Sequence, residues 1–411
     1  MSKGLMKSLV EYMTSKGGNG MNQLTDCLKG MNDDLIAFTQ ELVQMKSYSG
    51  QEEEIIRRIA SKMEELDYDE VTIDAMGNVL GRIGTGDQVI MFDSHVDTVE
   101  VKDETEWTVP PFSGEIVEGK LFGRGSVDMK SAAAASIFAG AAAKKCGLDT
   151  HKTIYVSCTV LEEDCDGENL KHLFQELGIR PNWMVICEPS DNLITLGHKG
   201  KAQVLIKTHG VSAHGSAPEK GKNAVYEMAE IIQRVEAVNE ALSKKEAPRG
   251  TLVLSQISSV SASLNAVPFH CEIYLDRRMV VGETEDTVRS EMEKIIEGKE
   301  ATWEVGTLHR TSWTGLPIDY EPLHPAWQID LDHPLTRACQ SAYAKTFGEA
   351  PNRYDYWDFS TNAVTTVAMG IPTIGFGPGE YKLAHMRDEN CRVDQIIDAC
   401  RFYVTLIAEM V

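Results

Sequence analysis

Six side chains of types that bind or activate metal ions come at the ends of four segments of this sequence. They are His95 with Asp97, then Asp128, then the adjacent pair Glu162 and Glu163, and finally Glu188. An imidazole nitrogen can bind zinc while a neighbouring carboxylate orients the ring, and the H-x-D spacing of His95 and Asp97 suits that arrangement. Taken alone, this pair is better explained as the polar end of a strand.

Each carboxylate also has a simpler explanation when it is considered by itself. Asp128 follows the stretch "GRGSVD" and could serve as a helix N-cap, which Asp favours. Glu162 and Glu163 could form a solvated acidic turn. Carboxylates that crowd together repel one another unless a cation compensates, so their convergence with His95 at one sheet edge would indicate a metal site.

The elements around these residues predict that convergence. An apolar run at 87–97 predicts a buried strand, and the alanine-rich segment 128–145 predicts a helix. The pattern continues with a strand at 153–164, a helix at 167–178 and a strand at 183–189. Alternating strands and helices predict an α/β fold with a doubly wound, largely parallel sheet, whose strand ends gather ligands at one edge.

The pattern changes after about residue 199 to the order β-α-β-β-α-β, with strands near 201–210, 251–259, 270–279 and 301–309. This order is typical of a ferredoxin-like α+β sandwich. We therefore expect an inserted lid and dimerisation domain at 199–311. The catalytic domain would comprise 1–198 and 312–411, with 1–32 as a loosely attached lead-in.

Composition excludes several classes of function. The 411 residues carry a formal net charge of −22, which repels nucleic acid and anionic membrane surfaces. The longest apolar run is too short to span a membrane, and we expect no signal peptide or anchor. The nine cysteines include no C-x-x-C pair. A cytoplasmic protein with reduced cysteines and no nucleic-acid or membrane partner is expected.

Seven motifs occur in this order along the sequence: "HVD", the W-x-x-x-PF of 107–112, "GKLFGRGSVDMK", the Glu pair, "CEPS", "GVSAHGSAP" and "AHMRDE". Together they resemble a known family of dinuclear zinc metallohydrolases. That family contains acetylornithine deacetylase, succinyl-diaminopimelate desuccinylase, aminoacylase and the glutamate-releasing carboxypeptidases. A subgroup sometimes linked to selenium metabolism is similar through "YDYWDFSTNA" and "GFGPGE".

The resemblance implies two Zn²⁺ ions per chain, a ligand set that Co²⁺ or Mn²⁺ could also occupy. One ion would be held by His95, Asp128 and Glu188. The other would be held by Asp128, Glu163 and His385, so that Asp128 bridges the two.

The resemblance also assigns roles around the ions. Asp97 would orient His95, and Glu162 would be the general base that takes a proton from the metal-activated water. His214 in "GVSAHGSAP" would reach the active site of a second subunit and stabilise the oxyanion, which implies a homodimer formed through the inserted domain.

Two further residues match positions that contact substrate in the family, namely Asn265 and Arg278. An Arg at this position commonly holds a carboxylate through its planar fork. Arg277 is adjacent, so the sequence leaves open which of the two arginines has this role. Lys130 and Arg124, beside Asp128, are interpreted as structural, while Asp358 and Ser360 are as compatible with a core and turn as with a substrate pocket.

The expected activity is metal-dependent hydrolysis of an amide bond in a small N-acyl amino acid or peptide. Glu rather than Asp at position 188 favours a deacylase or a carboxypeptidase within the family. The alternatives are a carbamoylase-type hydrolase of ureido groups and a catalytically silent relative that binds a small molecule. The presence of Glu162 argues against the silent relative, which would not need a base.

Overall fold

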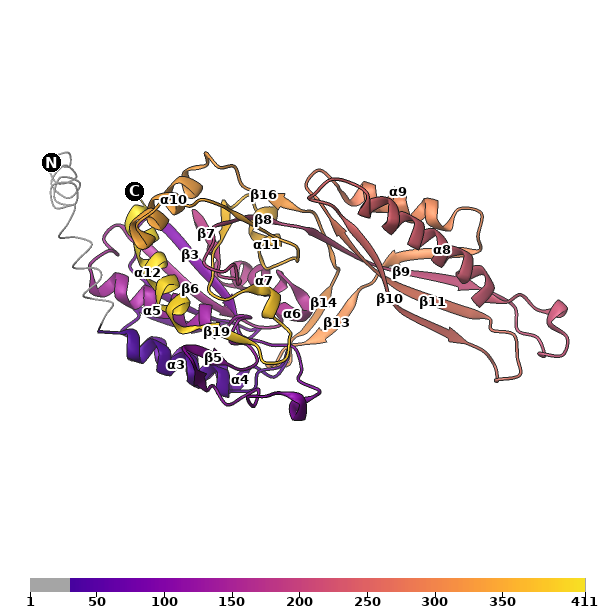
Figure 1. Cartoon of the computed structure of the whole chain (residues 1–411), viewed down its shortest axis with the longest axis horizontal. Coiled ribbons are helices and arrows are strands. Elements are labelled where there is room, and N and C mark those ends of the chain that lie inside the picture. The colour runs from indigo at the N-terminus through magenta and orange to yellow at the C-terminus, as the bar shows by residue number, and fades with distance from the viewer. Residues whose placement is uncertain (1–29, 411) are drawn as a thin grey trace.

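The computed structural model describes residues 30–410. Figure 1 shows an elongated molecule, with a large sheet and its helices on one side and a narrower unit of long strands and two helices on the other. The predicted lead-in at 1–32 lies almost entirely outside the described residues. Helix α3 begins at Asn32, at the end of that segment.

The large sheet has nine strands and a parallel centre. The four central strands run parallel in the order β6-β3-β7-β18, and the pairs β1-β2, β2-β6, β18-β8 and β8-β16 are antiparallel. The α/β prediction with a largely parallel central sheet is confirmed. The strands are β1 (Glu70–Ile73), β2 (Val79–Ile83), β3 (Gln88–His95), β6 (Lys152–Thr159), β7 (Trp183–Ile186), β8 (Thr195–His198), β16 (Trp327–Gln328), β17 (Asp355–Trp357) and β18 (Thr373–Gly375).

Helices cover this sheet with apolar faces whose spacing is visible in the sequence. In α4, Ile55, Ile56 and Ile59 are fully buried, and each contributes roughly 1.5–3 kcal/mol by leaving water. The alanine-rich α5 packs closely against α12, α3 and β3. The helices of this part are α3 (Asn32–Gln44), α4 (Glu53–Glu65), α5 (Lys130–Lys145), α6 (Glu162–Cys165), α7 (Glu168–Leu177), α10 (Pro334–Phe347), α11 (Ala363–Ala368) and α12 (Val393–Glu409).

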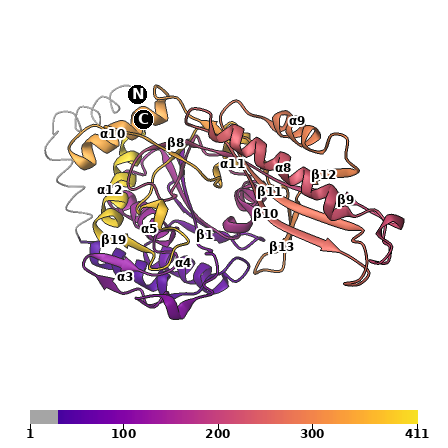
Figure 2. The same ribbon diagram turned by 45° about the vertical axis from the view of Figure 1, so that its right-hand side comes forward.

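The narrower unit is an antiparallel sheet in the order β10-β11-β9-β12, with two helices packed on it (Figure 2). Its buried side chains form a hydrophobic cluster separate from that of the large sheet. The β-α-β-β-α-β order matches the expectation, while the predicted domain boundaries stay predictions. The elements are β9 (Gly200–His209), α8 (Ala224–Ser243), β10 (Thr251–Val260), β11 (His270–Met279), α9 (Glu285–Ile296) and β12 (Ala301–Val305).

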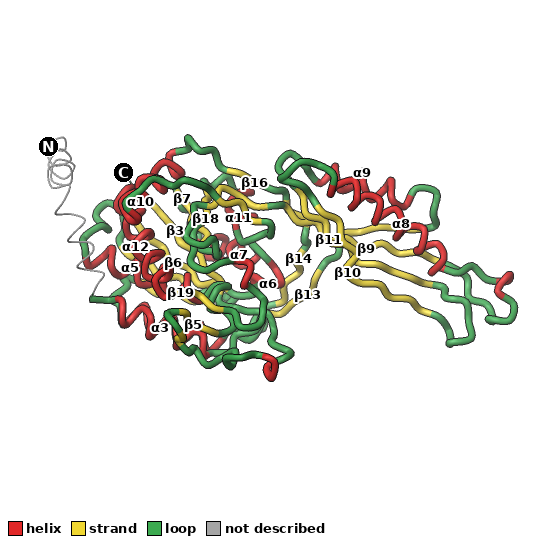
Figure 3. The backbone as a smooth tube through the Cα atoms, viewed as in Figure 1, coloured by secondary structure: helices red, strands yellow, loops and turns green. Residues whose placement is uncertain are grey.

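Shorter strands and helical turns lie between these elements (Figure 3). Some predicted strand ends are wrong: the strand predicted at 153–164 ends at Thr159, the one at 183–189 ends at Ile186, and the one at 301–309 divides into β12 and β13. No helix among residues 30–410 is long and apolar enough to cross a membrane. The short elements are η1 (Glu104–Glu106), β4 (Ile116–Val117), β5 (Lys120–Phe122), η2 (Pro218–Lys220), β13 (Leu308–Thr311), β14 (Pro317–Tyr320), β15 (Leu323–His324), η3 (Tyr381–Leu383) and β19 (Asn390–Arg392).

Candidate metal centre and pocket

His95 is the last residue of the central strand β3, and its imidazole is almost fully buried. Nδ1 lies 3.0 Å from the backbone oxygen of Asp97 and 3.5 Å from the Asp97 Oδ1 atom. A proton held on Nδ1 by that carbonyl leaves the Nε2 lone pair available as a ligand. Asp97 itself lies in the loop after β3, so the pair meets through a turn and not through the predicted strand alternation.

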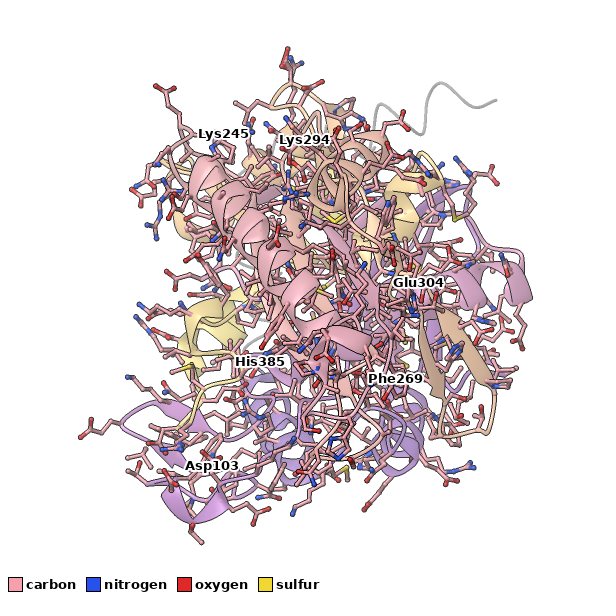
Figure 4. All side chains as sticks on the ribbon, turned by 90° about the vertical axis from the view of Figure 1, so that its right-hand side faces the viewer. Asp103, Lys245, Phe269, Lys294, Glu304 and His385 are labelled. Atoms are coloured by element: carbon pink, nitrogen blue, oxygen red, sulfur yellow. The ribbon has the colours of Figure 1, made fainter. Side chains whose placement is uncertain are left out.

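The carboxylate of Asp128 lies between two imidazoles. His95 Nε2 is 2.8 Å from its Oδ1 atom, and His385 Nε2 is 3.2 Å from its Oδ2 atom. These residues come from β3, from the loop before α5 and from the C-terminal segment, where Figure 4 labels His385. One carboxylate that faces a different imidazole with each oxygen has the arrangement of a bridging ligand.

The two remaining predicted ligands lie on opposite sides of this trio. Glu163 Oε2 is 3.0 Å from His385 Nε2, and Glu188 Oε1 is 3.6 Å from His95 Nε2. Two groups of donor atoms within 4.8 Å of one another could hold an ion. They are His95 with Asp128 and Glu163, and His95 with Glu162 and Glu188. The structure therefore brings together all of the residues predicted as metal ligands, with Glu162 beside them.

Glu162 and Glu163 do not end a strand as predicted, because they begin the short helix α6. Leu161 adopts a left-handed backbone conformation (φ 57°) that turns the chain after β6. The carboxylate of Asp97 accepts hydrogen bonds from the backbone N–H groups of Glu162 (3.0 Å) and Glu163 (3.1 Å). Asp97 therefore contacts His95 chiefly through its backbone oxygen and uses its side chain to hold the acidic turn.

The charges of this cluster fit a divalent cation. Burial raises the pKa of Glu162 and of Glu188 well above the ordinary range, and the neighbouring Asp128 raises that of Glu188 further. Hydrogen bonds to Asp128 and Glu163 raise the pKa of His385 to about 10. Raised pKa values of this kind mean that the negative charge of the carboxylates is not fully balanced by positive charge nearby. Bound cations would supply it, and the nitrogen and oxygen donor set suits zinc.

A pocket of about 280 Å³ opens beside the cluster. Arg278 lines it, whereas the adjacent Arg277 is fully buried and is bound to Glu283 and Glu291. The geometry therefore decides which arginine can contact a substrate. Arg278 lines the pocket, whereas Arg277 joins strand β11 to helix α9 through Glu291. The lining residues are Asp128, Glu162, Glu163, Asp166, Glu188, Lys201, Arg278, Phe359, Ser360, Tyr381, Ala384 and His385.

His214 and Asn265 do not line this pocket. They lie beside each other on the narrower unit, where His214 forms an isolated bridge with Ala266. His214 is exposed, and its Nδ1 atom is 2.7 Å from Ser216 Oγ. Within a single chain, then, neither residue contributes to the pocket lining, and their predicted roles stay predictions.

Two buried carboxylates that sequence reasoning left without a role hold the ligand loops. Glu52 is fully buried, and its Oε1 atom accepts the N–H of Leu161 at 3.1 Å. Glu389 accepts the N–H groups of Val127 (2.9 Å) and Asp128 (3.1 Å). Glu389 belongs to the motif "AHMRDE", so the sequence offered a reason to consider it. Glu52 lies in a run of three glutamates, and nothing in the sequence distinguishes it from its exposed neighbours.

Replacing Glu52 with Ala should weaken metal binding and turnover about 10- to 100-fold, as loss of a residue that orients metal ligands typically does. The reason is that the turn carrying Glu162 and Glu163 loses one of its two carboxylate partners. Metal titration would measure the effect, with the exposed neighbour Glu53→Ala as control. Glu52→Gln keeps an accepting oxygen and should lose less. Unchanged metal affinity in Glu52→Ala would contradict this role.

Comparison with known proteins shows the family of this chain. Residues 91–409 match the profile of Peptidase family M20/M25/M40. The chain is 35% identical over 382 residues to uncharacterized protein YgeY of Escherichia coli strain K12, covering 92% of this chain and 94% of that protein. It is 28% identical over 321 residues to acetylornithine deacetylase of Proteus mirabilis strain HI4320, covering 76% and 77%.

A solved structure shares the fold. The M20 family metallo-carboxypeptidase Sso-CP2 from Sulfolobus solfataricus superposes with a TM-score of 0.72 at 16% identity, covering 92% of this chain and 98% of that one. The family profile spans most of the chain and includes every predicted metal ligand. Similarity of this extent means that the chain belongs to Peptidase family M20/M25/M40 and is a metal-dependent hydrolase.

Proposed function

We propose that this chain hydrolyses the amide bond of a small N-acyl amino acid or peptide. The observation that carries the proposal is the Asp128 carboxylate held between two imidazoles, with Glu162 on the wall of the same pocket. Arg278, which also lines the pocket, would hold the carboxylate of the amino acid. The acetylornithine deacetylase relative supports a deacylase.

Two divalent ions, most simply Zn²⁺, would be held by the five ligands. His95, Asp128 and Glu188 would bind one, and Asp128, Glu163 and His385 the other. Two such ions, when bound, supply Lewis acidity and make a shared water acidic enough to lose a proton near neutral pH. The Nδ1–H of His95 would donate to the backbone oxygen of Asp97, and this hydrogen bond would fix the orientation of the ring for metal binding.

Glu162 would act as the general base. Its carboxylate would accept a proton from the attacking water and return it to the nitrogen of the leaving amine. Burial raises the pKa of Glu162, and a carboxylate of higher pKa is the stronger proton acceptor once it is ionised. The hydrogen bond from its backbone N–H to Asp97 holds the turn that carries it.

The complete site would form in a homodimer. Strand β10 is an edge of the narrower sheet, and it exposes Val253, Ile257 and Val260. Nearby Leu264 is fully exposed, and it precedes Asn265 directly. A second copy that covers this apolar edge would bring its His214 towards the first pocket to stabilise the oxyanion. Buried cysteines, seven of the eight described, suit a cytoplasmic location.

Metal analysis should find close to two equivalents of a divalent transition metal per chain. His95→Ala should lose a large part of that content, because His95 contributes the nitrogen donor of one site. His309→Ala, which removes an exposed histidine bound to Asp319, is the control. A metal-free protein with full activity would end the proposal.

The substrate can be found by screening metal-loaded protein. N-acetyl, N-succinyl and N-carbamoyl amino acids and dipeptides would be tested, with ninhydrin detection of the released amine. We expect release from N-acyl amino acids or dipeptides. If none of these compounds is cleaved while two metals are bound, a silent binding protein becomes the better interpretation.

A further inference from the structure

Two cationic residues stand directly opposite each other on the pocket wall. Lys201 on β9 and Arg278 on β11 are register partners in the antiparallel sheet, and both line the pocket. Directly opposed residues project from the same face of a sheet with Cβ atoms about 4.5–5.5 Å apart, and like charges in that position destabilise the pair. This pairing therefore needs compensating negative charge.

One carboxylate beside each cation supplies this compensation. Lys201 Nζ is 2.8 Å from Asp166 Oδ1, and the Tyr320 hydroxyl also donates to that carboxylate. Arg278 donates to both oxygens of Asp276, from Nε at 2.7 Å and from Nη2 at 3.1 Å. Each cation is thus paired with one carboxylate, and this part of the wall is close to neutral without a ligand.

Both cations retain donors for a ligand. An ammonium carries three N–H donors, and among residues 30–410 the Lys201 ammonium donates to Asp166 alone. In the same part of the chain, Nη1 of Arg278 makes no hydrogen bond. The Lys201 side chain is only 11% exposed, so water satisfies its remaining donors less well than on an open surface.

We infer that Lys201 and Arg278 together bind a single carboxylate of the substrate, and that Lys201 determines specificity for this acidic group. The inference rests on the proposed amide hydrolysis for its substrate and extends it by adding a second cation to the predicted arginine. The scissile amide would lie toward the acidic cluster, and the carboxylate toward the Lys201–Arg278 pair.

The charge and shape of the pair favour a carboxylate. A carboxylate has two oxygens that can accept from donors on two neighbouring strands at once. A cationic group would meet two positive charges, and a neutral amide would present a single oxygen to them. Because Asp166 and Asp276 already neutralise much of the wall, one added negative charge is better matched than the two of a phosphate.

The test measures binding, so its outcome is independent of whether the enzyme turns over. Calorimetry would compare succinate, glutarate and adipate with the half-amides of the same acids in the metal-loaded protein. Each half-amide keeps one carboxylate and replaces the other with a neutral isostere. The wild type should bind the best-fitting dicarboxylate about 10- to 100-fold more tightly than its half-amide, the range expected for a hydrogen bond to a charged group.

Lys201→Met should remove most of this preference, and Lys201→Arg should keep it. Lys207→Met, which removes another lysine of β9 that is paired with Glu304, is the matched control. Lys201→Met combined with Asp166→Asn avoids a buried unpaired carboxylate and guards against misfolding. A preference that persists in folded Lys201→Met variants, or no preference in the wild type, would overturn the inference.

Discussion

A Glu162→Gln enzyme is expected to keep its metal and to lose at least about 10²-fold in turnover, the range typical of a lost general base. Gln preserves the size of the side chain and its hydrogen-bonding capacity but cannot take up the proton. Glu162 lines the pocket and lies within 4.8 Å of His95 and Glu188 in the ligand cluster. Metal content and turnover would be measured on the same preparation.

Two variants of the same short helix sharpen this test. Glu163→Gln should lower metal content, because Glu163 contacts His385 at 3.0 Å. Asp164→Asn should change neither quantity, since Asp164 pairs with Arg310 away from the pocket lining. Near wild-type turnover in Glu162→Gln would reassign the role of the base. A loss of metal equal to that of Glu163→Gln would make Glu162 a ligand.

The fold was predictable because its signals are local. The apolar run that ends at His95 and the alternation of strand and helix are sequence periodicities, and the structure has the corresponding β3, α5, β6 and β7. The strand end at Glu162 and Glu163 was not predictable. Leu161 is not a glycine and yet adopts φ 57°, a conformation that Glu52 and Asp97 support through hydrogen bonds from far along the chain.

The metal ligands and Arg278 carried a motif signal in the sequence, whereas Lys201, which lines the same pocket, did not. His95, Asp128 and His385 belong to recognisable segments, and the structure brings them within hydrogen-bonding distance. Lys201 follows the sequence "GHKG" and looks like a solvated strand residue. Only the register of β9 with β11 shows that it faces the same pocket as Arg278.

His214→Ala is expected to lower kcat by about 10² to 10³-fold, the cost of removing one oxyanion donor, while metal content and the dimer persist. Within one chain His214 does not line the pocket, so the effect depends on its reaching a second subunit. His309→Ala, another exposed histidine, is the control. Wild-type kcat in His214→Ala would remove the residue from the proposed mechanism.

A mixed dimer tests the second subunit directly. A His214→Ala chain paired with a Glu162→Gln chain has one site that lacks both groups and one site that has both, provided that His214 acts across the dimer. Verified heterodimers should then recover up to half of the wild-type activity, although each parent homodimer is nearly inactive. If His214 acted within its own chain, every site would lack one group and no activity would return. Inactive heterodimers would therefore remove the main reason for a dimeric active site.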